Sequence, residues 1–242
     1  MLSLNDYLIR FFVTHVFTQL ELSSNTILLD LGCGNQPYKS IYGRYVNQAV
    51  SVDVEHRDAP LTLLSDSQFL PFSNNSFDII LFSEVIEHIP DYKMALNEIS
   101  RVLSPGGYLI ITWPFNYSMH ELPCDYLRIT EFGMQMVLEQ NGLQISQLFR
   151  RGNMMTLLHC FTGTLLTNMN EFFRRTPFLG KLFNPLLTSF DKFIEYTYFI
   201  GAKRIVNNDF FYPDAVGKKL RGVRGSLSLW TLGYCALVKK NE

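Results

Sequence analysis

A glycine-rich turn follows an apolar run near the start of the sequence, and its residue types suit ligand binding. Residues 28–31 (Leu-Leu-Asp-Leu) lead directly into Gly32-Cys33-Gly34-Asn35. Glycine lets the backbone approach a ligand closely, and a turn after a buried parallel strand lies at the sheet edge where α/β proteins bind nucleotides. Asp53 lies 19 residues after Gly34. A carboxylate at that separation can accept hydrogen bonds from both hydroxyls of a ribose, so we expect a nucleotide-like ligand.

Two further residues help to decide whether this turn binds a dinucleotide or a cationic ligand. Pro37 stands where a dinucleotide-binding G-x-G-x-x-G turn has its third glycine. Asp30 lies two residues before the first glycine, where its charge is unfavourable beside a pyrophosphate and favourable beside a cation. The turn therefore favours a ligand with a sulfonium or ammonium group, and a dinucleotide is the competing interpretation.

A second concentration of reactive side chains lies in residues 113–128, directly after another apolar run. This segment would leave the sheet at the same edge as the glycine turn, and it can bind a polar acceptor and remove its proton. We hypothesise that His120 or Asp125 is a general base for an oxygen acceptor. Three more side chains would bind and orient that acceptor: Tyr117, Tyr126 and Arg128. The alternative is that Asp125 and Arg128 form an ion pair that fixes the loop.

Apolar runs that alternate with helical patterns must position these residues. Continuous runs of Ile, Leu, Val and aromatic residues predict parallel strands at 26–31, 49–54, 77–82 and 108–113. A crossover helix is expected over 91–103, followed by a turn at 104–107, and a second helix from the N-cap Thr130 to Asn141-Gly142. Strands at 143–149 and 226–239 complete an α/β layout.

Composition and charge limit the function classes further. The 242 residues are 47% hydrophobic and 18% charged, which excludes disordered and coiled-coil classes. Residues 1–149 carry 7 Lys+Arg against 16 Asp+Glu, whereas residues 150–242 carry 14 against 6. A basic second half suits an anionic partner, a membrane surface or simply a solvated face.

The four cysteines are widely separated and include no C-x-x-C pair, which argues against a disulfide framework or a zinc cluster and favours a reducing compartment. No signal peptide is expected at the start of the chain, and the uncharged stretch 152–170 is too polar for a membrane span. We therefore expect a cytoplasmic protein, either soluble or peripherally attached to a membrane.

Taken in order, these features resemble the class I S-adenosylmethionine-dependent methyltransferases, particularly the methyltransferase type 11 group. The resemblance covers residues 26–149 and the final strand. It rests on linked motifs at 28–35, 52–53, 66–72, 76–80, 83–89 and 101–107. It implies a Rossmann-like, doubly wound and mostly parallel sheet with an antiparallel final strand and a helical insertion before it. The implied organisation is a cofactor-binding core at 1–153, an apolar and basic cap at 154–225, and the last core strand at 226–242.

The resemblance also implies S-adenosylmethionine as the cofactor. Asp30 and the glycine turn would hold the methionine part, Asp53 the ribose hydroxyls and Asp66 the adenine. Ser83 and Glu84 would line the site beneath the sulfur. The full implied cofactor set is Asp30, Gly32, Cys33, Gly34, Asp53, Val54, Asp66, Ser67, Ser83 and Glu84.

On the acceptor side, some type 11 members share the pattern His-x-x-Pro-x-Asp-Tyr-x-Arg, present here from His120 to Arg128. His88 belongs to a Glu-His pair that the family keeps with unrelated acceptors. This favours a place in the wall of the substrate site over a role in proton transfer.

The expected function is methyl transfer to a small-molecule, sugar or lipid-linked acceptor, at an oxygen atom. In-line displacement from a sulfonium needs mainly positioning of the nucleophile, and the sequence alone suggests no metal site. Alternatives are a nucleic-acid methyltransferase, against which the absence of an Asn/Asp-Pro-Pro-Tyr-type motif counts, and a non-catalytic protein with the cofactor fold. The cap would cover the acceptor, rest on anionic lipid or form a homodimer surface.

Overall fold

The computed structural model describes residues 3–154 and 231–242, together with isolated positions between 156 and 196. Within these residues, seven strands form one sheet in the order β3-β2-β1-β4-β5-β7-β6. The strands are β1 (Ile27–Leu31), β2 (Gln48–Asp53), β3 (Leu63–Leu64), β4 (Phe77–Ser83), β5 (Leu103–Pro114), β6 (Leu143–Arg151) and β7 (Gly233–Lys240). The helices are α1 (Leu4–Gln19), α2 (Lys39–Tyr42), the short 3₁₀ helix η1 (Ile86–His88), α3 (Tyr92–Val102) and α4 (Glu131–Gln140).

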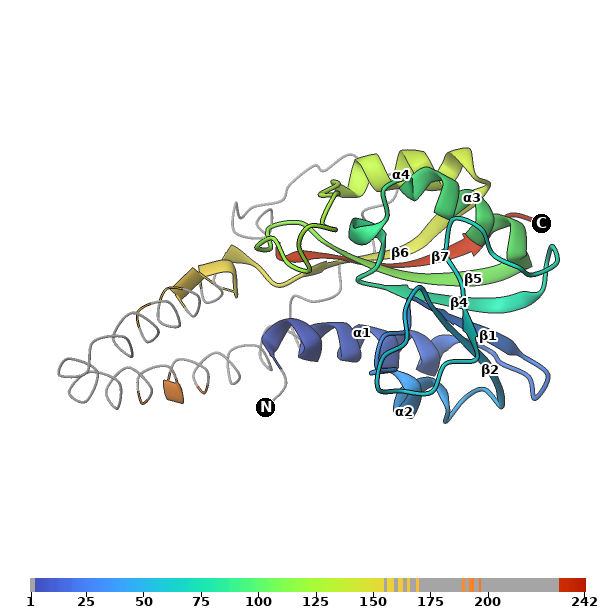
Figure 1. Ribbon diagram of the computed structural model, residues 1–242, viewed down its shortest axis with the longest axis horizontal. Helices are drawn as coiled ribbons and strands as arrows, with labels where there is room; N and C mark the ends of the chain where they lie inside the picture. Colours follow the sequence, from blue (N-terminus) through green and yellow to red (C-terminus); the bar gives the residue numbers. More distant parts are fainter. Residues whose placement is uncertain are drawn as a thin grey trace.

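Helices cover both faces of the sheet. Figure 1 shows α3 and α4 on one face and α1 and α2 on the other. Alternate residues of β1 divide between the two sides, with Leu29 and Leu31 in the core under α3 and α4, and Leu28 in the core under α1. This alternation is the period of two expected of a strand buried on both faces.

The order of the strands fixes where a ligand can bind. β1 pairs in parallel with both β2 and β4, so the chain leaves the carboxyl end of β1 at the point where the strand order reverses. Open α/β sheets bind ligands at such switch points. The glycine turn after β1 and the residues after β4 therefore flank the expected crevice.

The predicted doubly wound sheet with an antiparallel last strand is confirmed, because β7 runs antiparallel to both β5 and β6. The predicted N-cap Thr130 is also present, because its side chain accepts from the Gly133 amide at the start of α4, and the side chain of Asp91 accepts from the Met94 amide at the start of α3. These caps satisfy amides that have no partner within the helix.

Two local predictions differ from the structure. Residues 104–107 are not a turn between helix and strand, because β5 begins at Leu103, which pairs with Phe77 before a register shift leads to the Ile79–Tyr108 pair. The N-terminal residues form a sixteen-residue helix, α1, which the sequence analysis did not identify. Its buried apolar residues recur at three- and four-residue steps from Leu8 to Phe17.

Most of the predicted cap at 154–225 lies outside the described residues, as does the first part of the predicted strand at 226–239. The described part of that last strand begins at Gly233. Among the helices that the structure describes, none combines the length and the apolar character that a bilayer crossing requires.

Candidate active site

The carboxylate of Asp30 lies at the end of β1 with one oxygen unused. Asp30 is 3% exposed, and its Oδ2 has no hydrogen-bond partner among the described residues. Burial raises the pKa of Asp30 to about 7, although a hydrogen bond with Tyr42 acts in the opposite direction. A buried carboxylate oxygen without a donor is costly, and a cationic ligand would remove that cost.

The two glycines that follow Asp30 have different roles. Both have positive φ angles, +67° at Gly32 and +48° at Gly34. A Cβ at Gly32 would lie 2.4 Å from a methyl carbon of Val85, whereas a Cβ at Gly34 would have no atom within 4 Å. Gly32 therefore permits close packing against the segment after β4, and Gly34 faces open space where a ligand can approach.

Backbone amides hold the carboxylate of Asp53 at the end of β2. Its Oδ2 accepts from the Gly34 amide at 2.8 Å, and its Oδ1 accepts from the Val54 amide at 2.8 Å. These bonds fix the carboxylate beside the glycine turn, in the place predicted for the ribose acid. Val54 itself is 71% exposed. Cys33 is buried, and burial raises the pKa of its thiol to about 12, which makes it unreactive.

Asp66 lies next to this edge, because the Ser65 amide donates to the Asp53 carbonyl at 3.0 Å. Its Oδ1 accepts from the Gln68 amide at 2.8 Å, and the Gln68 side chain donates to its Oδ2 at 2.9 Å. Ser67, the next residue, is buried. The structure thus brings the predicted adenine loop together with the predicted ribose acid.

Ser83 is the last residue of β4 and Glu84 follows it, on the other side of the switch point. The Ser83 hydroxyl donates to the Tyr38 hydroxyl at 3.2 Å and lies 2.9 Å from that of Thr112. Glu84 has a φ of +53°, unusual for a residue with a side chain, and its Oε1 accepts from the Thr112 hydroxyl at 2.8 Å. Both predicted residues therefore lie at the carboxyl end of β4.

A buried arginine that the sequence analysis missed holds Glu84 in place. Arg151, at the end of β6, is completely buried, and its Nη1 lies 2.9 Å from Glu84 Oε2. It also donates to Asn5 Oδ1 at 3.1 Å and to the Trp113 carbonyl at 2.9 Å. This one guanidinium joins α1, β5 and β6 to the residue after β4.

In the acceptor segment, Arg128 engages the carboxylate of Asp125 through two contacts. Nη1 lies 2.5 Å from Oδ1 and Nη2 lies 2.8 Å from Oδ2, and the Asp125 side chain is 1% exposed. The guanidinium lowers the pKa of Asp125 to about 2. A carboxylate held in this way is a weak base, so these contacts favour the alternative in which the pair fixes the loop.

His120 lies between two carboxylates, with Nδ1 3.5 Å from Asp125 Oδ2 and Nε2 facing the carboxylate of Glu87. Glu87 is completely buried in η1, and neither of its carboxylate oxygens has a hydrogen-bond partner among the described residues. Its Oε1 is 3.6 Å from His120 Nε2 and 3.7 Å from His88 Nε2, and the two imidazole rings are 4.8 Å apart. Burial raises the pKa of Glu87, and Glu87 raises that of His120.

Of the two predicted tyrosines, Tyr117 packs edge-on against the His120 ring with centroids 5.5 Å apart, and Tyr126 is 52% exposed. Glu87 was not among the predicted site residues. The signal available in the sequence was its place in the Glu-His pair, but a pattern cannot show that its carboxylate would be buried without a donor.

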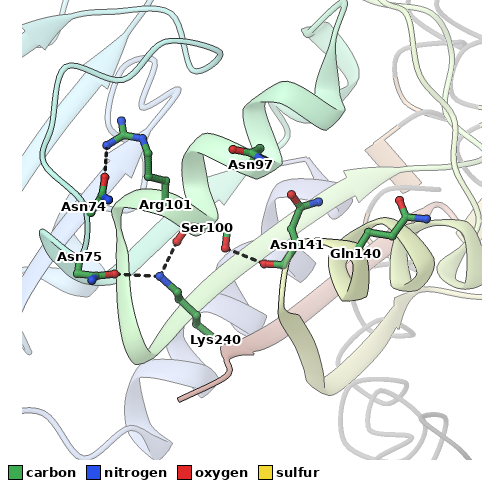
Figure 2. Close-up of a pocket in the computed structure, with 8 residues that line it drawn as sticks. All are labelled: Asn74, Asn75, Asn97, Ser100, Arg101, Gln140, Asn141 and Lys240. Carbon is green, nitrogen blue, oxygen red and sulfur yellow. Dashed lines mark hydrogen bonds between the residues drawn. The ribbon is translucent and has the colours of Figure 1, made fainter.

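A polar hollow of about 380 Å³ lies at the opposite edge of the sheet, near the start of β5 and the end of β7 (Figure 2). Its lysine, Lys240, donates to Asn75 Oδ1 at 3.0 Å and to two backbone carbonyls, and its arginine, Arg101, is paired with Glu98. The cations that line this hollow are already neutralised or hydrogen-bonded. The hollow is separate from the predicted site.

Comparison with known sequences agrees with this geometry. The profile of the family described as a methyltransferase domain, of type 11, matches residues 29–111. A sterol 4-C-methyltransferase of Caenorhabditis elegans is 27% identical over 112 residues, which are 40% of this chain and 34% of that protein. A demethylmenaquinone methyltransferase of Staphylococcus haemolyticus is 26% identical over 111 residues, 40% of this chain and 46% of that protein. The chain thus spans less than half the length of these two relatives.

Solved structures share the fold over a larger part of the chain. The [4+2]-cyclase SpnF superposes with a TM-score of 0.56 at 14% identity, covering 95% of this chain and 80% of that one. A sarcosine dimethylglycine methyltransferase assigned in Galdieria sulphuraria superposes with a TM-score of 0.53 at 17% identity, covering 98% and 84%. The profile match therefore identifies a methyltransferase domain of the type 11 group over residues 29–111, and the solved structures share the fold of the chain.

Proposed function

We propose that this protein transfers a methyl group from S-adenosylmethionine to an oxygen atom of a small-molecule, sugar or lipid-linked acceptor. The observation that carries the proposal is the buried, unpartnered Oδ2 of Asp30 beside the open face of Gly34. A carboxylate in that position needs a positive partner, and the cofactor of this family carries one on its sulfur and another on its amino group.

The residues of the turn fit the cofactor in their chemistry. When bound, S-adenosylmethionine supplies an electrophilic methyl group on a positively charged sulfur. Asp30 and the backbone of the glycine turn would hold its methionine part, with Asp53 at the ribose hydroxyls. Asp66 and the Ser67 amide would hold the adenine, while Ser83 and Glu84 would lie beneath the sulfur, where Arg151 and Thr112 keep the Glu84 carboxylate in one orientation.

The acceptor would bind over η1 and residues 113–128. Of the two predicted bases, we favour His120, because Arg128 holds Asp125 as a weakly basic ion pair. His120 Nε2 faces the Glu87 carboxylate, which would stabilise the imidazole after it takes the hydroxyl proton. His88 would form part of the wall of the acceptor site, and Tyr117 and Tyr126 would orient the acceptor.

An apolar or lipid-linked acceptor suits the exposed side chains of this segment. Met119 is 74% exposed and Leu122 is 67% exposed, next to Tyr126. The names of the sterol and demethylmenaquinone methyltransferases also indicate apolar acceptors for those relatives. Cytoplasmic location, membrane contact through residues 154–225 and a homodimer remain our predictions from the sequence.

Calorimetric titration tests the cofactor assignment. S-adenosylmethionine and S-adenosylhomocysteine should bind to the full chain, and NAD should not. Asp30→Asn should weaken binding strongly, whereas Asp58→Asn, which changes an exposed carboxylate in the loop after β2, should leave it unchanged. Equal binding by both variants would contradict the assignment of Asp30.

The acceptor assignment needs a separate screen. Labelled S-adenosylmethionine would be offered with phenols, quinols, sterols and sugars, and the methylated atom identified by NMR. We expect transfer to oxygen. Methylation of carbon alone would overturn the choice of atom, and full turnover by both His120→Gln and Asp125→Asn would remove the assignment of a base.

A further inference from the structure

Three side chains after β4 and in the acceptor segment present metal-ligating atoms to one another. Glu87, His88 and His120 each offer one such atom, and these atoms all lie within 4.8 Å of one another. Glu87 is completely buried, and both of its carboxylate oxygens lack hydrogen-bond partners among the described residues. An unpartnered buried carboxylate requires a positive charge nearby if it is to remain ionised.

The hydrogen bonds of the two imidazoles determine which nitrogen is free. His88 Nδ1 lies 2.6 Å from the Cys124 carbonyl oxygen, and His120 Nδ1 lies 3.2 Å from the Ser118 carbonyl oxygen. A carbonyl only accepts, so each Nδ1 carries the proton of the neutral ring and each Nε2 keeps its lone pair. Both lone pairs lie on the nitrogen nearest Glu87 Oε1, at 3.7 and 3.6 Å.

This arrangement brings electron-rich atoms together with no donor between them. One proton could bridge the carboxylate to one imidazole, but the other imidazole would still lack a partner. A single divalent ion satisfies all three groups at once. From the zinc–ligand lengths of 2.0–2.2 Å, ligand atoms in a tetrahedral site are about 3.4 Å apart. The two nitrogen–oxygen distances here need to shorten by about 0.3 Å, and the two imidazole nitrogens, which lie within 4.8 Å of each other, would approach by a rotation of the partly exposed rings.

We propose that Glu87, His88 and His120 form a binding site for one divalent transition-metal ion, with Zn²⁺ the best match. Two neutral imidazoles and one carboxylate are a ligand set that zinc accepts, and this set leaves a fourth position open. The His88 and His120 side chains are 16% and 29% exposed, so solvent or a ligand can reach that position from their side.

Hydrogen bonds from the surrounding residues hold the two histidine rings in the way that is usual for metal ligands. Histidines that bind metals donate their other N–H to a carbonyl or a carboxylate, which fixes the ring. The Cys124 carbonyl does this for His88, and the Ser118 carbonyl for His120. Asp125 Oδ2 lies 3.5 Å from His120 Nδ1, and Arg128 fixes that carboxylate. The Asp125–Arg128 pair would thus hold the metal ligand His120 in position.

One consequence rests on the proposed methyl transfer. With the ion bound, His120 would be a ligand, and an acceptor hydroxyl in the open position would lose its proton to solvent water because the ion lowers the pKa of that hydroxyl. Zinc would then accelerate the reaction, whereas a metal-free His120 base would be inhibited by zinc. The proposed metal site does not depend on this consequence.

The test uses the full chain, stripped with a chelator and then titrated with Zn²⁺ alone by calorimetry. We expect one ion per chain, and Co²⁺ should give the visible absorption of a four-coordinate site. Glu87→Gln and His120→Ala should each weaken Zn²⁺ binding by more than about 100-fold, because loss of a direct ligand costs more than the 10–100-fold typical of a supporting residue. Asp125→Asn should fall within that lower range.

His56→Gln serves as the matched control, because His56 is an exposed histidine outside the cluster. Its Zn²⁺ affinity should equal that of the unmodified chain. Failure of the unmodified chain to bind Zn²⁺, or equal binding by the His120→Ala, Glu87→Gln and His56→Gln chains, would overturn the proposal. Circular dichroism of each variant tests whether loss of the fold causes the weaker Zn²⁺ binding. His120 lies in a loop, so truncation of its side chain should disturb the core little.

Titration with S-adenosylmethionine on the same samples separates this proposal from the proposed function. Zinc binding without cofactor binding would support the metal site and contradict the methyltransferase function. Cofactor binding without zinc binding would contradict the metal site and support the methyltransferase function.

Discussion

The cofactor side and the acceptor side of this site hold their carboxylates by different means. Asp53 accepts hydrogen bonds from backbone amides of the turn and the strand end, which any sequence with this backbone supplies. On the proposed acceptor side, Asp125 is instead held by the side chain of Arg128. Glu87 has no donor among the described residues. The position of Asp53 thus depends on the backbone, and that of Asp125 depends on one particular side chain.

The family match covers the proposed cofactor residues and η1, and it ends at residue 111, before the acceptor segment begins. Fold similarity to a [4+2]-cyclase is consistent with one architecture serving different reactions. The proposed cofactor residues therefore lie in the shared part of the chain, and we expect acceptor specificity to depend on the residues after β5.

The largest effect should follow from removing the guanidinium that joins the two regions. Arg151→Leu leaves Glu84 and Asn5 without their partner in a buried place, so we expect it to lower the free energy of unfolding by about 3–5 kcal/mol. Urea denaturation measures this. Arg44→Leu, at an exposed position, should change stability by no more than about 0.5 kcal/mol, and similar effects of the two substitutions would contradict the assigned role of Arg151.

Asp30→Asn should come next and should affect only the cofactor side. Losing a buried charge that pairs with a cation costs about 3 kcal/mol, so the affinity for S-adenosylmethionine should fall about 100-fold. Calorimetry measures the affinity, and Zn²⁺ binding measured on the same variant should be unaltered. A loss of both would mean that the two regions are not separable.

The pH dependence of stability offers a further test of Asp30 on the ligand-free chain. The pKa of Asp30 is raised to about 7 in the folded state, so between pH 4 and pH 7 the folded chain retains a proton that the unfolded chain has lost. This carboxyl should therefore lower the free energy of unfolding by about 1.4 kcal/mol per pH unit as the pH rises through that range. Asp30→Asn should remove this contribution and make the chain more stable at pH 8. If the variant retains the full slope in urea denaturation, the pKa assignment is wrong.

Asp125→Asn should have the smallest effect. It should change the rate of methyl transfer and leave cofactor binding nearly unchanged. Weakening the pair with Arg128 loosens the loop around His120, so we expect methyl transfer to slow about tenfold through poorer positioning. The affinity for S-adenosylmethionine should stay within twofold of the unmodified chain. Single-turnover rates and calorimetry on one preparation separate these quantities.

The sequence predicted the cofactor side well because its signals are local. A glycine turn, an acid at a fixed separation and helix caps such as Asp91 and Thr130 are all readable within a few residues. The signals of helix α1 are equally local, with Ser3 as N-cap and apolar steps after it, although for these residues the sequence analysis predicted only that they are not a signal peptide.

The remaining features depend on contacts between distant residues. Ser104 to Gly107 read as a turn because Pro and Gly are turn residues, whereas pairing between Leu103 and Phe77 draws them into β5. Arg151 and Glu84 are 67 positions apart in the sequence, and nothing in either local pattern indicates that they meet. Likewise, the meeting of Glu87 with His120 depends on how residues 113–128 fold back over η1.

Val85 links the two sides mechanically. Its methyl groups occupy the space that a side chain at Gly32 would need, and Val85 directly precedes η1, which carries Glu87 and His88. Even a single added carbon in the turn that receives the donor would push Val85 aside and displace the residues that meet the acceptor. Evolution of the first region is therefore constrained by the second, although the two share no ligand-binding residue.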